Sequence, residues 1–467
     1  MVFAAHELME FEKNSDERRI LMVAAQIVIV IALLAMISGK VPLYLTAFVG
    51  AVIAALVAGF PMTAAWAPDG WTGTPIIVMV QQAGLHPVIL DMLGVLLFIG
   101  IMERVGYLKS IIHAIIRVGY KIGGGPGVVT GGGVAAGIIG GMTGFTQPAI
   151  TGVVTGPPAV EMGMEKNRVA GILAHAGHLG NLGGFTHPTI VAVVAMAGIA
   201  WGPTNAVGVI VALSIFAASY FRVTKMMKKE GTLGNKADLN LEASEVPVGK
   251  ALFPFGVMIV SFVLGLPVLM AGIGSALLVI VMSMTNVADA EKAMMDGLVR
   301  IIVPLFATVS FLFMARIVQE IGLIDLLVRS EFSEYHDANI VVGGALYGAM
   351  QAGPIVLVLI MFFVGSFAGL VTQSNAASIP FIMPVLLALL AAGVHPVAAA
   401  VAAAGGPAIM QYYLTGGPVA ALSTVIPIVP GSDLKVANRF QRPSILIGMV
   451  VLLLITVCLG LVLPHGL

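Results

Sequence analysis

The sequence predicts an all-α polytopic membrane protein with two repeats, each containing a re-entrant helical hairpin and a broken transmembrane helix. Of the 467 residues, 59% are hydrophobic and 10% are charged, whereas about a quarter of the residues of a soluble domain are charged. Apolar stretches of ~20 residues, the length of a membrane-spanning helix, recur along the whole chain. Two of the apolar regions are interrupted by similar clusters of small polar residues, which indicates a duplication.

The chain begins with a polar segment of mixed charge, residues 1–19, which does not have the pattern of a signal peptide and is expected to be cytoplasmic. The first membrane repeat is expected over residues 20–221. Its predicted helices and apolar runs are 20–38, 42–60, 76–102, 110–122, 169–190 and 190–221. A polar linker, residues 222–250, follows, and its excess of Lys and Arg close to helix ends indicates the cytoplasmic side.

The second membrane repeat is expected over residues 251–467. It begins with residues 252–285, predicted as two helices broken near Pro267, and its other predicted helices are 301–318, about 340–369 and 444–463. Residues 286–300 are a polar patch and residues 329–338 a charged loop. The short segment 318–324 parallels 102–108 of the first repeat, so that Gly322 occupies the place of Gly106.

The most informative stretch is 142–158, which is crowded with Gly, Thr, Gln and Pro inside an apolar region. The stretch 370–384 repeats it, with Thr146-Gln147 matching Thr372-Gln373 and Pro158 matching Pro384. A further match aligns Asn181 with Gln411 and Pro188 with Pro418. The re-entrant candidates are therefore 146–158 and 372–384, and the broken-helix candidates are 181–188 and 411–418. Interrupted apolar segments at corresponding positions of two halves indicate a transporter binding site.

Chain that turns back at membrane depth leaves backbone donors and acceptors that need polar partners. Helix N-termini favour anions, whereas unwound carbonyls favour Na⁺. The hypothesis is that these turns bind a small carboxylate and a cation together; the alternative is that their polar residues only cap the helix breaks. The candidate substrate-binding residues are Thr146, Gln147, Thr186, His187, Thr372, Gln373, Ser374, Asn375 and Thr415. The candidate Na⁺ ligands are Gly144, Asn181, Ser374, Asn375, Ser378 and Gly416.

Ionisable residues inside apolar spans are a second class of candidate. His175 and His178 share a helix face close to His187, and these histidines could ligate a metal, carry a coupling proton or hydrogen-bond within the bundle. The other candidates are Asp91, Glu103, Arg104, Arg316 and Glu320. Of these, all but Asp91 lie at helix ends, where snorkelling and local ion pairs are the commoner explanation.

These motifs resemble the ion transporter superfamily, which includes divalent-anion/sodium symporters, the large membrane subunits of TRAP transporters, gluconate-type permeases and dicarboxylate carriers. Gly183-Gly184-Phe185-Thr186-His187-Pro188 is similar to the family's unwound helices, and the run 374–378 to the Ser-Asn-Ala signature of its second hairpin. The first hairpin departs, because Thr146-Gln147-Pro148 stands where Ser-Asn-Thr is expected. The resemblance implies an inverted repeat, a dimerising scaffold and an elevator-like motion.

We therefore expect a secondary active transporter of a small organic anion, a carboxylate or dicarboxylate, coupled to Na⁺ or H⁺. A multi-pass protein of the inner membrane is expected, acting as a homodimer in the lipid bilayer, with no cofactor besides the coupling ion and no enzymatic activity. One alternative is a cation/proton antiporter of the same fold. Another is the membrane subunit of a TRAP-like system, with a small membrane subunit and a binding protein as partners. The net charge of zero gives no electrostatic footprint for nucleic acid.

Overall fold

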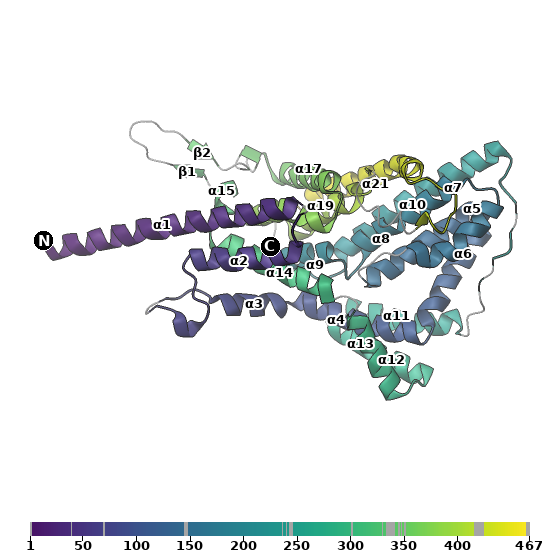
Figure 1. The fold of residues 1–467 in the computed structure, drawn as a ribbon, viewed down its shortest axis with the longest axis horizontal. Coiled ribbons are helices and arrows are strands. Elements are labelled where there is room, and N and C mark those ends of the chain that lie inside the picture. Colours follow the sequence, from purple (N-terminus) through teal and green to yellow (C-terminus); the bar gives the residue numbers. More distant parts are fainter. Residues whose placement is uncertain are drawn as a thin grey trace.

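The computed structural model describes residues 2–463 apart from 39, 69–70, 144–147, 236, 240, 242–245, 300–301, 329, 333–340, 344–345, 347, 350–351 and 415–424. Eight helical segments in this part are long and apolar enough to cross a membrane. The chain is therefore an α-helical polytopic membrane protein, as the composition predicts. The helices run mostly along the long axis of an elongated molecule, and the N-terminal helix projects beyond the rest at one end (Figure 1).

The first half contains the following elements in order: α1 (Val2–Ile37), α2 (Leu43–Val57), the 3₁₀ turn η1 (Ala64–Trp66), α3 (Ile76–Gly84), α4 (Pro87–Arg104), α5 (Tyr107–Thr143), α6 (Pro148–Glu161), α7 (Lys166–Ala174), α8 (Ala176–Gly183), α9 (Pro188–Met196) and α10 (Pro203–Glu230). The second half contains α11 (Val248–Val263), α12 (Val268–Ser283), α13 (Val287–Val299), α14 (Ile302–Glu320), α15 (Asp325–Val328), β1 (Ser330–Phe332), β2 (Val341–Gly343), α17 (Pro354–Thr372), the 3₁₀ turn η2 (Ala376–Ser378), α18 (Ile379–Ala391), α19 (Pro396–Met410) and α21 (Leu434–Val462).

Several expected boundaries were wrong. The run 76–102 is two helices rather than one, because proline begins α4 at position 87 and cannot continue α3. The polar patch 286–300 is helical as α13, and the polar N-terminal segment is the beginning of α1. The last helix begins at Leu434 rather than at 444, and the helix expected from about 340 begins at Pro354. β1 and β2 pair antiparallel near the expected loop 329–338, so the chain is not strictly all-α.

The helices form two groups by their contacts. α1–α3 pack with α14, and α4 packs with α12 and α13 while α11 packs on α12; these two sets are together called the frame group. α5–α10, α17–α19 and α21 are called the core group, and α4 of the frame group also lies against α5. Within the core group, α5 packs on α6 and α8, α17 packs on α19, and α10 packs on α21. The two groups meet where α9 lies against α14 and α4, where α11 lies against α5, and where α1 and α14 lie against α18.

Small residues bring the frame helices together. α4 crosses α12 where Gly94 and Gly272 lie against each other, and it crosses α13 where Gly100 lies against Ala293 and Gly297. Without a hydrophobic driving force in lipid, helix association depends on such close backbone approach. Gly94, Gly100, Gly272 and Gly297 therefore serve packing.

The replacement Gly272→Ala is expected to destabilise the frame, because its β-carbon would lie against the backbone of Gly94 and force α4 and α12 apart. Overpacking of this kind costs about 1–3 kcal/mol. The matched control is Gly274→Ala on the same helix, where a β-carbon meets nothing within 4 Å. Both replacements gain the same helix propensity, so the melting temperature in detergent should fall for Gly272→Ala relative to Gly274→Ala. Equal melting temperatures would show that the crossing is not tight.

Candidate functional site

The first helix break lies between α8 and α9, at residues 184–187, inside the range expected from the sequence. His187 caps α9, since its Nδ1 accepts the backbone N–H of Thr189 at 3.3 Å. The backbone N–H of Phe185 and the hydroxyl of Thr186 both donate to the carbonyl oxygen of Gly141, at 2.8 and 3.1 Å. The break is therefore held against the end of α5, the first arm of the first hairpin.

The second hairpin turns between α17 and α18. Gln373 ends α17 in the left-handed region, at φ 50° and ψ 28°, a conformation that is uncommon for residues other than glycine. Thr372 Oγ1 lies 2.9 Å from the carbonyl oxygen of Ser374 and 3.1 Å from Ser378 Oγ, and Ser378 Oγ lies 2.9 Å from the same carbonyl oxygen. Three oxygens, all from one turn, thus form a triangle.

Hydrogen bonds connect this turn to both helix breaks. The backbone N–H of Asn375 donates to Gln411 Oε1 at 2.9 Å, just beyond the end of α19. Asn375 Nδ2 lies 3.3 Å from His187 Nδ1, and Asn181 Nδ2 donates to the hydroxyl of Tyr412 at 3.0 Å. We call this assembly the polar junction; its members are Asn181, Thr186, His187, Thr372, Gln373, Ser374, Asn375, Ser378, Gln411 and Tyr412. Residues distant in the sequence therefore lie together here, from the second hairpin and the two helix breaks. The expected meeting of the two hairpin tips stays a prediction, because residues 144–147 lie outside the described part of the chain.

The geometry also assigns the proton on His187. Its Nδ1 receives one N–H from Thr189 and faces the amide of Asn375, so Nδ1 is an acceptor and the ring proton lies on Nε2. Because His187 Nδ1 is an acceptor, the amide of Asn375 turns its Nδ2–H₂ donor toward the ring. Its Oδ1 therefore points away from His187. Asn375 is only 2% exposed, and its Oδ1 has no hydrogen-bond partner among the residues described.

Buried polar atoms without a partner also occur elsewhere in the described chain, as at Gln441, but that of Asn375 lies at a hairpin tip. Gln373 Oε1 is a second one in the described part of this turn. Together with the triangle of Thr372, Ser374 and Ser378, these oxygens make the hairpin tip rich in acceptors, which is the chemistry that a hard cation prefers. Five of the candidate residues that the sequence indicated thus lie together: Thr372, Gln373, Ser374, Asn375 and Ser378.

Other candidate residues from the sequence do not belong to the second hairpin tip. Gly144, Thr146, Gln147, Thr415 and Gly416 lie outside the described residues, so the first hairpin tip and the second break from residue 415 onward are not placed. Asn181 reaches the junction through Tyr412. The sequence argument did not single out Tyr412, because an aromatic residue in an apolar run has the pattern of core packing. Gln411 was noted only as the counterpart of Asn181.

The histidine pair lies beside the junction in a buried polar chain. His175 Nε2 lies 2.7 Å from Ser219 Oγ, which donates to Ser444 Oγ at 2.7 Å. The ring of His178 lies edge-on to that of Tyr412, with 4.5 Å between centroids. Among the described residues, no group of three His, Cys, Asp or Glu side chains could hold a metal. His175 is thus hydrogen-bonded within the bundle, whereas both ring nitrogens of His178 are buried without a hydrogen-bond partner among the described residues.

The remaining ionisable candidates with described contacts stabilise helix ends. Asp91 on α4 accepts the backbone N–H of Leu269 at 3.0 Å, in the first turn of α12. A carboxylate is favourable at a helix N-terminus. Arg316 and Glu320 form an ion pair of 2.6 Å within the last turns of α14.

Comparison with known proteins places the fold among membrane transporters. No protein-family model and no curated protein matches the sequence. The YdaH transporter of Alcanivorax borkumensis, a protein of unusual topology, superposes with a TM-score of 0.58 at 16% identity, over 83% of this chain and 88% of that one. MtrF of Neisseria gonorrhoeae, from a class of antimetabolite efflux pumps, gives a TM-score of 0.56 at 13% identity over 94% of both chains. Neither protein is among the groups named for the sequence resemblance, so the comparison supports that resemblance only in showing a fold shared with membrane transporters.

Proposed function

We propose that this protein is a secondary active transporter of a small organic anion, a carboxylate or dicarboxylate, coupled to Na⁺ in the inner membrane. Its fold is shared with membrane transporters of Alcanivorax borkumensis and Neisseria gonorrhoeae. The observation that carries the proposal is the unpartnered, buried Oδ1 of Asn375 at a hairpin tip that is hydrogen-bonded toward both helix breaks. A polar atom left without a partner in this place is most simply explained by a ligand that completes it.

In this proposal the cation binds at the second hairpin tip. Its ligands come from Asn375 Oδ1, Gln373 Oε1 and the oxygens of Thr372, Ser374 and Ser378. Sodium needs several oxygens but no carboxylate when dipoles converge on it. The anion then binds next to it, near the Nε2–H of His187 and the N-terminus of α9, where helix N–H groups favour negative charge. Cation and anion together carry less net charge across the apolar barrier than either alone.

The proposed motion is of the elevator type, with the core group moving against the frame group. The polar junction lies entirely within the core group, so a ligand bound there would travel with it. The glycine crossings Gly94–Gly272 and Gly100–Gly297 hold α4, α12 and α13 of the frame group together, and the proposal gives the frame group a fixed, dimerising role. Both the homodimer and the motion are part of the proposal.

A binding screen tests the proposed function. Purified protein is heated with each member of a series of mono- and dicarboxylic acids, with Na⁺ or with choline as the only cation. A ligand at 100 times its dissociation constant stabilises the native state by about 2.7 kcal/mol. We expect at least one acid to raise the melting temperature in Na⁺ much more than in choline. Stabilisation by none of the acids, or equal stabilisation in both buffers, would contradict Na⁺-coupled anion transport.

A further inference from the structure

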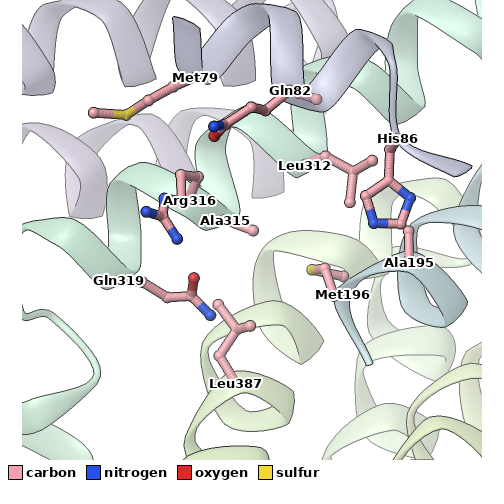
Figure 2. A pocket seen from close by; sticks show the side chains of 11 residues that line it. Met79, Gln82, His86, Ala195, Met196, Leu312, Ala315, Arg316, Gln319 and Leu387 are labelled. Carbon is pink, nitrogen blue, oxygen red and sulfur yellow. The ribbon is translucent and has the colours of Figure 1, made fainter. Parts of the chain in front are cut away.

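A cavity of about 240 Å³ lies where the frame group meets the core group, away from the polar junction. It is formed by the break between α3 and α4, by α14, by the C-terminal end of α9 and by α18. In Figure 2 the guanidinium of Arg316 lies between the amides of Gln82 and Gln319, and the imidazole of His86 lies beyond Leu312 on the other side. Met79, Met196 and Leu387 supply apolar walls.

The polar side chains around this cavity are all able to donate hydrogen bonds. His86 Nδ1 accepts the backbone N–H of Val88 at 3.3 Å, so the proton of the neutral ring lies on Nε2. Arg316 carries a permanent charge and a planar set of donors that matches a carboxylate. Gln82 and Gln319 each add an amide N–H₂. None of the described lining residues is acidic, so this combination favours an anion.

The charge of Arg316 is paired with the carboxylate of Glu320 on the same helix. Its Nη2 lies 2.6 Å from Glu320 Oε1, and the two side chains are 47% and 29% exposed. An exposed ion pair four residues apart on a helix contributes less than about 1 kcal/mol. Glu320 is not among the described residues that line the cavity. A carboxylate arriving in the cavity can therefore engage the guanidinium at little cost.

The cavity and the polar junction lie along the same two helices. α9 runs from His187 in the junction to Ala195 at the cavity, and α18 follows Ser378 and reaches the cavity at Leu387. At 1.5 Å per residue, each path covers about 12–14 Å. A ligand in the cavity would thus be separate from a ligand in the junction, and the same two helices, α9 and α18, would lie beside both.

We propose that this cavity is a staging site that binds the carboxylate of a small organic anion before the anion reaches the junction. The inference rests on the proposed function, since it takes the transported substrate to be such an anion. Arg316 is its charged ligand, and Gln82, His86 and Gln319 orient the carboxylate. A volume of 240 Å³ is below the ~300 Å³ at which pockets for drug-sized ligands begin. The site thus takes one small acid or the carboxylate end of a larger one.

The test uses succinate and benzoate as probes, as choline salts, with binding followed by the thermal shift of the full chain. The background variant is Asn375→Ala, which disables the junction and leaves the cavity intact. In that background we expect at least one probe to raise the melting temperature. Adding Arg316→Gln should weaken its apparent affinity roughly 10- to 100-fold, the range for loss of a charged hydrogen bond.

Two further variants separate charge from structure. Arg316→Lys should retain part of the affinity that is lost in Arg316→Gln, because lysine keeps the positive charge but not the planar set of N–H donors of arginine. Glu320→Gln should leave binding unchanged or strengthen it, since it removes only the competing carboxylate. Because Arg316 is half exposed, the melting temperature without probe should change little in each variant, which shows that each folds.

The outcomes are distinct. A shift that disappears with Asn375→Ala but survives Arg316→Gln would place binding in the junction and overturn the staging site. Absence of a shift with both probes in the Asn375→Ala background would overturn it as well. An Arg316-dependent shift without Na⁺-dependent uptake of any organic acid would instead reject the proposed transport function and leave the cavity as a carboxylate site.

Discussion

The replacement Asn375→Ala is expected to lower Na⁺-driven uptake by about 100-fold or more while leaving the folded protein in the membrane. The bond from Asn375 to Gln411 uses the backbone N–H, so alanine retains it and the hairpin turn keeps its anchor. What alanine removes is the amide, with its contact to His187 and the unpartnered Oδ1. Hydrogen bonds to charged groups contribute about 1.5–3 kcal/mol, and a loss of 2.7 kcal/mol is a factor of about 100.

Stability measurements separate a ligand role from a capping role. If Asn375 only supported the fold, alanine would lower the melting temperature. If it serves a ligand, alanine removes a buried unsatisfied oxygen and the protein should be equally stable or more stable in the absence of ligand. The matched control is Thr308→Ala in α14, a buried hydroxyl bonded only locally, to the carbonyl of Pro304 at 3.0 Å. Normal uptake by Asn375→Ala would show that the Asn375 side chain does not serve the ligand.

The first hairpin should respond in the same way. Thr146 lies outside the described residues, but it corresponds to Thr372 in the duplicated stretch. We therefore expect uptake to be lost in Thr146→Ala as in Asn375→Ala. Normal uptake by Thr146→Ala, with loss by Asn375→Ala, would make the two hairpins functionally unequal.

Local signals in the sequence predicted where helices stop. The break after Gly183-Gly184 and the one at Pro267 follow from glycine and proline, which act on the backbone within a residue or two. The parallel between Gly106 and Gly322 also appears in the structure, since both adopt positive φ, 74° and 68°. Gly106 lies in the turn that follows α4, and Gly322 lies in the corresponding turn that follows α14.

One local signal was present but was not used. His86, His187 and His395 are each followed by proline, and each caps the helix that the proline begins, with Nδ1 accepting the N–H two residues on at 3.2–3.3 Å. The His-Pro pair is thus a helix-start motif in this chain. Applied to His86-Pro87, it would have divided the run 76–102 into α3 and α4.

Contacts between distant residues could not be predicted in detail. Asn375 and His187 are 188 residues apart, and Asn181 and Tyr412 are 231 apart. The duplication indicates that equivalent turns meet, but only the packing of α8, α19 and the hairpin decides which side chains bond. The cavity around Arg316 was missed for the same reason, because it combines four helices with unrelated motifs.

A sodium gradient alone is expected to drive uptake into proteoliposomes, whereas a proton gradient alone in sodium-free buffer is not. The described oxygens of the second hairpin tip can ligate a cation without titrating. The carboxylate most open to proton coupling by sequence, that of Asp91, is engaged by the N-terminus of α12 in the frame group. His187 is poorly suited to carry the proton, because a proton on Nδ1 would face the N–H of Thr189 and the amide of Asn375.

Two variants make this comparison decisive. Ser378→Ala removes one oxygen of the triangle and should raise the Na⁺ concentration for half-maximal uptake about 10-fold, which corresponds to the ~1.4 kcal/mol contribution of one good ligand. Ser366→Ala on α17 is the matched control, since its hydroxyl bonds only to the carbonyl of Phe362, one turn earlier on the same helix, at 2.6 Å. Uptake driven by the proton gradient without sodium, and lost in His187→Ala, would overturn the sodium assignment. It would transfer the coupling role to the histidines, because His187 would then have to exchange its capping bond for a proton in each cycle.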